Sequence, residues 1–242
     1  MKIVAWAACI ALVACSTPPD GKPGDGERAA SLPAIPGAKE FTRLDLPNLD
    51  DNVRNDTLLI YTTHQLPDGT FLMAAKNVED NREGLRLIQY RPLPDSSAHV
   101  LAVSKPAYDS AVMLPTYFTT GDTADGIIIL ANYGERESWG QNVFWLKDGR
   151  LKDLGWIDVG ERGWKADADS MQQWRTSIAP RTEVRGADGK FDFTFTGDSV
   201  QLYDDQQGHQ EVMLPVDRIR YRYDGTEMLL VIDGAPRKPM PL

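Results

Sequence analysis

Apolar and polar side chains alternate with a period of two in several segments of this chain. In residues 191–196 phenylalanines alternate with Asp and Thr, and in residues 218–223 Ile and Tyr alternate with Arg. This period is typical of β-strands with one buried and one exposed face. Residues 127–131 and 143–146 are apolar at every position, which predicts two strands covered on both faces.

Further segments rich in apolar and β-branched residues predict additional strands. They are 58–63, 70–75, 85–91, 99–103, 112–119, 199–203, 210–214 and 228–232. The pattern indicates one short helix, at about 166–174, and no long segment has a period of 3.6 residues. The predicted fold class is therefore all-β.

Asp-Gly dipeptides separate several of these strands, with the Asp at positions 68, 148, 188 and 224. Both central residues of a type I′ turn need positive φ, which Gly adopts freely and Asp tolerates. Residues 144–156 therefore read as a hairpin around one such turn. A turn spacing near 40 residues is that of a four-stranded propeller blade, but the units share no further signature. A propeller-like arrangement and a β-sandwich or barrel-like sheet fit the pattern equally well.

The first residues have the pattern of a bacterial export signal. Lys2 precedes an apolar run, 3–14, that is shorter than the roughly 20 residues of a membrane-spanning helix. The run ends in Leu12-Val13-Ala14-Cys15, which resembles the lipobox of bacterial lipoproteins. The resemblance implies cleavage before Cys15 and a lipid anchor on its sulfur. Because Ser16 rather than Asp follows, it also implies an outer-membrane lipoprotein that faces the periplasm. A secretory signal cleaved elsewhere is the alternative.

This interpretation divides the chain into four parts. They are a signal peptide (1–14), a flexible Pro/Gly-rich tether (15–38), a single all-β domain (39–233) and a disordered tail (234–242). Cys9 would leave with the signal and Cys15 would carry the lipid. We therefore expect neither a disulfide nor thiolate chemistry in the domain.

The charge of the chain and the motifs that it lacks disfavour several classes of function. The formal net charge of −9 disfavours a nucleic-acid partner and favours a cationic one. His64, His99 and His209 have no metal-ligand spacing, and we expect them at the surface or in turns. The chain also has no nucleophile elbow and no phosphate-binding loop. We predict no catalytic activity and no cofactor.

Two acidic features have weaker interpretations. Asp122 and Asp125 precede a strand and supply at most part of a calcium site, with a simple Asx-type turn as the alternative. Acidic residues, either neighbours in the sequence or from adjacent strands, are expected to neutralise the arginine row at 218, 220 and 222 in part.

The tryptophans are the most informative side chains. Outside the signal they lie between residues 139 and 174. Trp145 and Trp156 are in predicted strands, where we expect core packing. The other three lie in segments that look irregular and contain arginines, which is typical of binding hot spots. The predicted binding residues are Tyr133, Arg136, Trp139, Arg162, Trp164, Trp174 and Arg175. The alternative is that these tryptophans plug the ends of the sheet.

Together these features predict a lipid-anchored periplasmic binding module without catalytic activity that recognises an envelope protein. One concrete version is an inhibitor or immunity protein against a lysozyme-like hydrolase. The chain is similar to the β-rich lipoproteins that inhibit lysozyme in general character only, and carries no inhibitor motif. One alternative is a cell-wall glycan-binding protein, or a glycan hydrolase that uses Trp platforms and paired carboxylates. Another is a structural or assembly lipoprotein of an outer-membrane complex.

Overall fold

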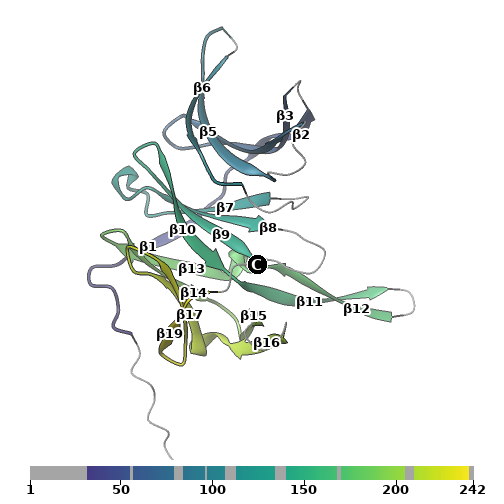
Figure 1. Ribbon diagram of the computed structural model, residues 1–242, viewed down its shortest axis with the longest axis vertical. Helices are drawn as coiled ribbons and strands as arrows, with labels where there is room; N and C mark the ends of the chain where they lie inside the picture. The colour runs from purple at the N-terminus through teal and green to yellow at the C-terminus, as the bar shows by residue number, and fades with distance from the viewer. Residues whose placement is uncertain are drawn as a thin grey trace, which may run out of the picture.

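The chain is a β-protein built from three antiparallel sheets (Figure 1). The computed structural model describes residues 32–54, 57–78, 84–95, 97–106, 113–133, 140–167, 170–204 and 210–239. Over these ranges the only helices are short 3-10 turns, η1 (Thr123–Asp125), η2 (Ala179–Arg181) and η4 (Val216–Arg218). None of them has the length and hydropathy to cross a membrane. The predicted all-β class is confirmed.

The largest sheet has ten strands and curls into a half-barrel. In spatial order the strands are β10 (Arg150–Ile157), β9 (Gln141–Lys147), β8 (Ile127–Tyr133), β7 (Met113–Thr119), β1 (Lys39–Leu44), β13 (Thr182–Ala187), β14 (Lys190–Phe195), β17 (Ile219–Tyr223), β18 (Met228–Ile232) and β19 (Ala235–Arg237). The curl brings the edge strand β10 beside β17 and β18. We refer to this contact as the seam of the half-barrel.

The main core lies inside the curl. It takes buried side chains from nearly every strand of the half-barrel, among them Phe41, Ile128, Val143, Phe193 and Leu230. Alternate residues of β8 and β9, such as Ile129 and Phe144, point to a second core on the other face. The segments 127–131 and 143–146 are therefore buried on both sides, as their uninterrupted apolar pattern predicted.

A five-stranded sheet packs against this second core. It runs in chain order through β2 (Asn48–Arg54), β3 (Leu58–Gln65), β4 (Phe71–Asn77), β5 (Arg86–Pro92) and β6 (Ala98–Val103). Leu72, Ala74 and Leu87 face the half-barrel. The other face carries a small cluster of Met73, Ala75 and Ile88.

A four-stranded sheet completes the fold, in the order β12 (Ser170–Ser177), β11 (Val159–Asp167), β15 (Ser199–Asp204) and β16 (Gln210–Pro215). The β11–β12 hairpin extends away from the body (Figure 1). The predicted helix at 166–174 is wrong, because residues 166–167 end β11 and residues 170–174 belong to β12. Cross-strand pairs such as Ala166↔Met171 supply the backbone hydrogen bonds there, and the segment has no helical apolar repeat that would compete with them.

The Asp-Gly turns explain how several neighbouring strands are connected. At Asp148-Gly149 and Asp188-Gly189 both residues have positive φ, between 50° and 74°, as a type I′ turn requires. Asp233-Gly234 is a further turn of this kind. It leads into β19, which pairs with β18 inside the segment predicted as a disordered tail. In the longer loops at positions 68 and 224 only the Gly has positive φ.

These turns do not delimit propeller blades. Those at positions 148, 188 and 224 all join strands of the same ten-stranded sheet. A propeller would need separate four-stranded sheets around an axis. The barrel or sandwich alternative fits the structure, and the spacing near 40 residues reflects hairpins within one continuous sheet.

Candidate functional site

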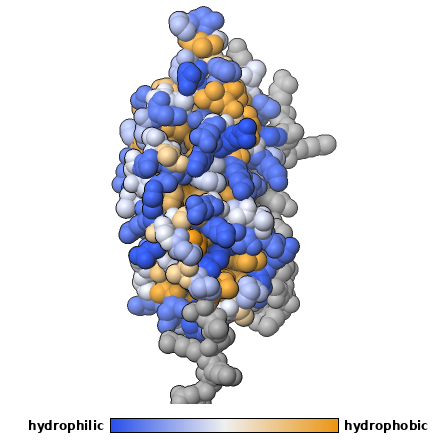
Figure 2. Space-filling view, turned by 90° about the vertical axis from the view of Figure 1, so that its left-hand side faces the viewer, coloured by the Kyte–Doolittle hydropathy of each residue, from blue (hydrophilic) through white to orange (hydrophobic). Residues whose placement is uncertain are grey.

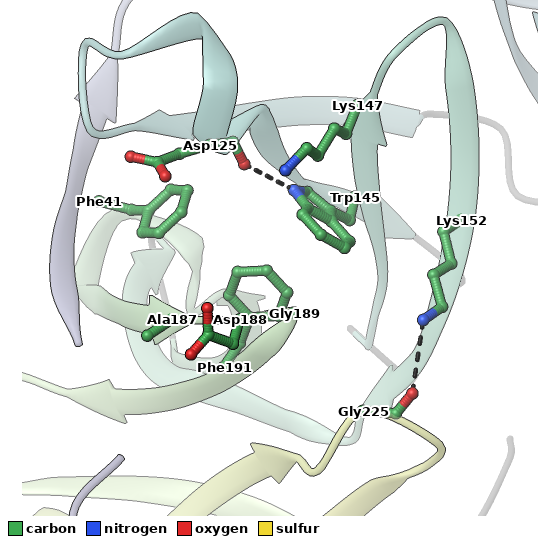
Figure 3. A pocket seen from close by; sticks show the side chains of 11 residues that line it. Phe41, Asp125, Trp145, Lys147, Lys152, Ala187, Asp188, Gly189, Phe191 and Gly225 are labelled. Atoms are coloured by element: carbon green, nitrogen blue, oxygen red, sulfur yellow. Dashed lines mark hydrogen bonds between the residues drawn. The ribbon is translucent and has the colours of Figure 1, made fainter. Parts of the chain in front are cut away.

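Several connections of the half-barrel meet at one of its ends. They are the β9–β10, β13–β14 and β17–β18 turns and the β7–β8 loop that contains η1. Figure 2 looks onto this end, where apolar side chains show between charged ones. A pocket of about 380 Å³ opens among the turns (Figure 3), a volume within the range of small-ligand sites. This Trp145 pocket is lined by Phe41, Asp125, Trp145, Lys147, Lys152, Gly186, Ala187, Asp188, Gly189, Phe191 and Gly225.

Aromatic rings form the floor of the pocket. Phe191 contacts Trp145 edge-to-face with ring centroids 5.2 Å apart, and contacts Phe41 in the same way at 5.7 Å. Phe41 and Phe191 are buried, whereas Trp145 is half-buried. Edge-to-face packing favours a defined ring orientation. The floor therefore belongs both to the core and to the pocket.

The indole of Trp145 is also held by a hydrogen bond. Its Nε1 donates to the backbone oxygen of Asp125 at 2.8 Å. The chain can come this close because Gly126 follows, with φ of 77°. A Cβ at Gly126 would lie 2.8 Å from Trp145 Nε1 and 2.5 Å from the Leu146 oxygen. Packing and this hydrogen bond together orient the ring before any ligand binds.

Trp145, Lys147 and Lys152 form one wall of the pocket, on a face of the β9–β10 hairpin that also carries Arg150 beside the pocket. Trp145 pairs with Lys152, and Lys147 pairs with Arg150, so all four side chains lie on the same face. Lys147 Nζ lies 5.2 Å from the centroid of the Trp145 ring. Lys147, Arg150 and Lys152 are hereafter the cationic hairpin face. A hollow of about 510 Å³ lies along it.

Asp125 lines the pocket next to Trp145. Its carboxylate accepts hydrogen bonds from Lys39 Nζ at 2.8 Å and from Thr120 Oγ1 at 2.7 Å. These two bonds lower the pKa of Asp125 below its ordinary value, so it is ionised at neutral pH. The neighbouring Asp122 accepts from the backbone N–H of Ala124 at 2.9 Å and caps η1.

The weak calcium candidates thus have structural roles that agree with the Asx-type turn. In the described part of the chain, no group of three or more His, Cys, Asp or Glu side chains is placed to hold a metal ion.

The predicted binding residues that the structure describes are not among those that line the Trp145 pocket. Tyr133 ends β8, and Ser177 at the end of β12 donates to Asn132 beside it at 2.8 Å. The structure therefore brings β8 and the base of the β11–β12 hairpin together. Arg136 and Trp139, like Cys15, lie outside the described residues.

Arg162, Trp164, Trp174 and Arg175 are in strands rather than in loops. Trp164, Trp174 and Arg175 belong to the β11–β12 ladder, in which Trp174 pairs with Gly163 and Arg175 with Arg162. The irregular loops predicted for them are wrong.

Arg162 is the predicted binding residue whose side chain the structure describes. Its Nη2 lies 3.9 Å from the Glu211 carboxylate within the four-stranded sheet. This places Arg162 in a contact within the protein.

Two other expectations have clear outcomes. His64 is buried and not at the surface, because it lies on the face of β3 that packs against the half-barrel. The arginine row is neutralised in part, as expected. Arg222 makes two hydrogen bonds of 2.6 Å to Asp192 on the neighbouring strand, and Arg218 pairs with Asp233.

The sequence interpretation assigned Trp145 to core packing and missed the pocket beside it. A type I′ turn at Asp148-Gly149 fixes the pairing of the flanking residues. That pairing places Trp145 opposite Lys152 and Lys147 opposite Arg150, so this wall of the pocket had a signal in the sequence. The wall with Asp125 and the floor with Phe41 had none.

Comparison with known proteins does not identify the chain. No protein-family model, no curated protein and no solved structure matches it. Its function must therefore be inferred from the pocket itself.

Proposed function

We propose that this chain is a lipid-anchored binding module of the bacterial cell envelope, without catalytic activity, whose Trp145 pocket holds a sugar ring of an envelope glycan. The observation that carries the proposal is the half-buried Trp145 ring, oriented in advance at the edge of an aromatic floor. A sugar ring has a C–H face that packs on an aromatic ring. Its hydroxyl groups both donate and accept hydrogen bonds.

The pocket supplies partners for both the C–H face and the hydroxyl groups of a sugar. Trp145 and Phe191 offer apolar surface, Lys147 and Lys152 offer donors, and Asp188 offers an acceptor. A few polar groups around an apolar surface are the usual composition of a small-ligand site. Figure 3 shows these side chains around the open volume.

The carboxylates favour binding over hydrolysis. A glycosidase needs a carboxylic acid that is protonated near neutral pH, which requires a raised pKa. Asp125 has the opposite environment, because Lys39 and Thr120 stabilise its ionised form. A proton donor for a leaving sugar is therefore not provided at this position.

The pocket also favours the glycan over an envelope protein as the ligand. A stable protein interface buries about 1,600 Å² in total, and its hot spots would be the predicted Trp and Arg residues. Arg162 is engaged with Glu211 instead. The Trp145 pocket has the volume and the mixture of aromatic and polar side chains of a small-ligand site, and for this reason we prefer the glycan alternative to the inhibitor and assembly alternatives.

The test is calorimetric titration of the purified full chain with soluble glycan fragments from digested cell wall. We expect Trp145→Ala to weaken binding by about fivefold to tenfold, since a well-placed aromatic contact contributes roughly 1–1.4 kcal/mol. Trp145→Phe should lose less, because a ring remains. Trp139→Ala and Trp174→Ala are matched controls that should bind like the native protein. Undiminished binding by a folded Trp145→Ala variant would refute the proposal.

A further inference from the structure

Among the described residues that line the Trp145 pocket, Asp125 is the one that forms an ion pair, and its charge also acts on Lys147. Lys39 lies 2.8 Å from the Asp125 carboxylate. On the β9–β10 hairpin, Lys147, Arg150 and Lys152 form no ion pair within 4 Å with any residue that the structure describes. The chain as a whole has a net charge of −9. Three cations without an ion pair on one hairpin face therefore make this face positive in an acidic protein.

The two lysines are placed over aromatic rings. Lys147 Nζ is 5.2 Å from the Trp145 centroid, and Lys152 Nζ is 5.0 Å from the Tyr223 centroid. Lys152 also donates a long hydrogen bond of 3.4 Å to the Gly225 oxygen. These contacts hold the ammonium groups at the pocket while their charges remain available. A cationic ligand would have to compete with them for the same ring faces.

Two other acidic residues line the pocket or the hollow beside it, and both sit at turn tips. Asp148 and Asp188 occupy the positive-φ positions of their turns, and both are exposed. Water screens such groups well. The three cations lie along the hairpin face beside the rings, so an anion held there would meet the cations before the turn carboxylates.

We infer that the sugar held in the Trp145 pocket is acidic, and that its carboxylate binds to the cationic hairpin face while its ring packs on the aromatic floor. This inference rests on the proposed function and names the ligand class of the same site. Charge-assisted hydrogen bonds from Lys and Arg to a carboxylate are stronger than neutral ones. They would select acidic sugars over neutral sugars of the same shape.

The experiment compares two probes that differ only in charge. One is the peptidoglycan disaccharide of N-acetylglucosamine and N-acetylmuramic acid, and the other is the same disaccharide with its carboxylate converted to a primary amide. Calorimetric titration of the full chain should show the acid binding about tenfold to a hundredfold more tightly than the amide. Higher salt should weaken binding of the acid and leave the amide unaffected.

Substitutions on the cationic hairpin face test whether it causes the preference for the acid over the amide. Arg150→Gln is the first choice, because Arg150 has no side-chain contact in the described structure that its loss would disturb. It should reduce the ratio of acid to amide affinity, as should Lys147→Gln, and Lys147→Arg should restore the ratio. Arg91→Gln, at an exposed position on β5, removes the same charge elsewhere and should leave the ratio unchanged.

The outcomes separate the two proposals. Equal affinity for acid and amide, both lost in Trp145→Ala, would overturn the inference and leave the glycan-binding function standing. A preference for the acid that survives in all hairpin variants would also overturn the inference. Binding of neither sugar, or tighter binding of an acidic peptide, would overturn both.

Discussion

Tyr221 and Asp158 show how single side chains organise the half-barrel. Both are buried, and the Tyr221 hydroxyl donates to the Asp158 carboxylate. Burial raises the pKa of Tyr221 well above its ordinary value, and the charge of Asp158 raises it further, so the hydroxyl remains a donor. Asp158 separates β10 from β11, the point at which the chain leaves the half-barrel for the four-stranded sheet. The hydrogen bond between Tyr221 and Asp158 therefore links the core of the half-barrel to the point where the chain leaves it.

We expect Tyr221→Phe to lower the free energy of unfolding by about 1–3 kcal/mol, because a buried carboxylate loses a hydrogen-bond donor. Urea unfolding measures the change. Tyr223→Phe is the control: its hydroxyl donates to the Gly225 oxygen near the surface, so its loss should be smaller. Equal losses in the two variants would contradict the role given to Asp158.

At the scale of elements, the seam between β10 and β18 decides how tightly the half-barrel curls. The pairing of β10 with β9 shifts register between Asp153 and Gly155, which marks a β-bulge. Gly155 has φ of 113°, and a Cβ there would lie 2.7 Å from Met228 Cβ. The bulge thus brings β10 close to β18, and Lys152 of the same strand reaches Gly225 across the seam.

We expect Gly155→Ala to reduce stability by roughly 2–4 kcal/mol, since it combines backbone strain with a steric clash across the seam. Gly149→Ala is the matched control. It also has positive φ, at 67°, but nothing lies within 4 Å of an added Cβ, so only the strain should be observed. Chemical denaturation of both variants gives the comparison. A smaller loss at Gly155 than at Gly149 would show that the seam is not tightly packed.

At the scale of the whole molecule, the five-stranded sheet packs on the half-barrel through a core that contains titratable groups. His64 of β3 packs edge-to-face on Tyr117 of β7, with centroids 5.3 Å apart. His64 Nδ1 lies 3.2 Å from the Pro47 oxygen, so it is the donor of the neutral ring. Burial lowers the pKa of His64 below its ordinary value. The two sheets therefore pack best when His64 is uncharged.

This predicts a loss of stability in mild acid. In the unfolded chain a histidine titrates near about 6.5, and His64 titrates lower in the folded protein. The contribution of the neutral ring is complete above the unfolded pKa and is lost as the pH falls through the folded one. Unfolding free energies measured between neutral and mildly acidic pH should decline in the native protein and decline less in His64→Phe. Parallel profiles would contradict the prediction.

A separate loss is expected at lower pH. Hydrogen bonds from Thr226 and from the backbone of Glu227 and Thr226 lower the pKa of Asp224 to about 2. Its contribution is present above the ordinary carboxyl range and disappears as the pH falls through about 2. The loss at His64 begins at a higher pH than the loss at Asp224, and comparison with His64→Phe separates the two contributions.

The sequence by itself determined the local features of this protein. Alternation in 191–196 and 218–223 predicted half-buried strands, and uninterrupted apolar runs predicted that β8 and β9 are covered on both faces. Asp148-Gly149 predicted a hairpin, and the structure shows that this hairpin pairs Trp145 with Lys152. These features are readable because side-chain alternation and turn dihedral angles depend on neighbouring residues alone.

Only the tertiary structure decided the order of the strands, the curl and the pocket. β1 lies between β7 and β13, so Phe41, Trp145 and Phe191 meet from strands far apart in the chain, and Lys39 reaches Asp125. The ends of β11 and β12 pair across a hairpin where the sequence indicated a helix. Such contacts depend on long-range packing, which the pattern of any one segment does not encode.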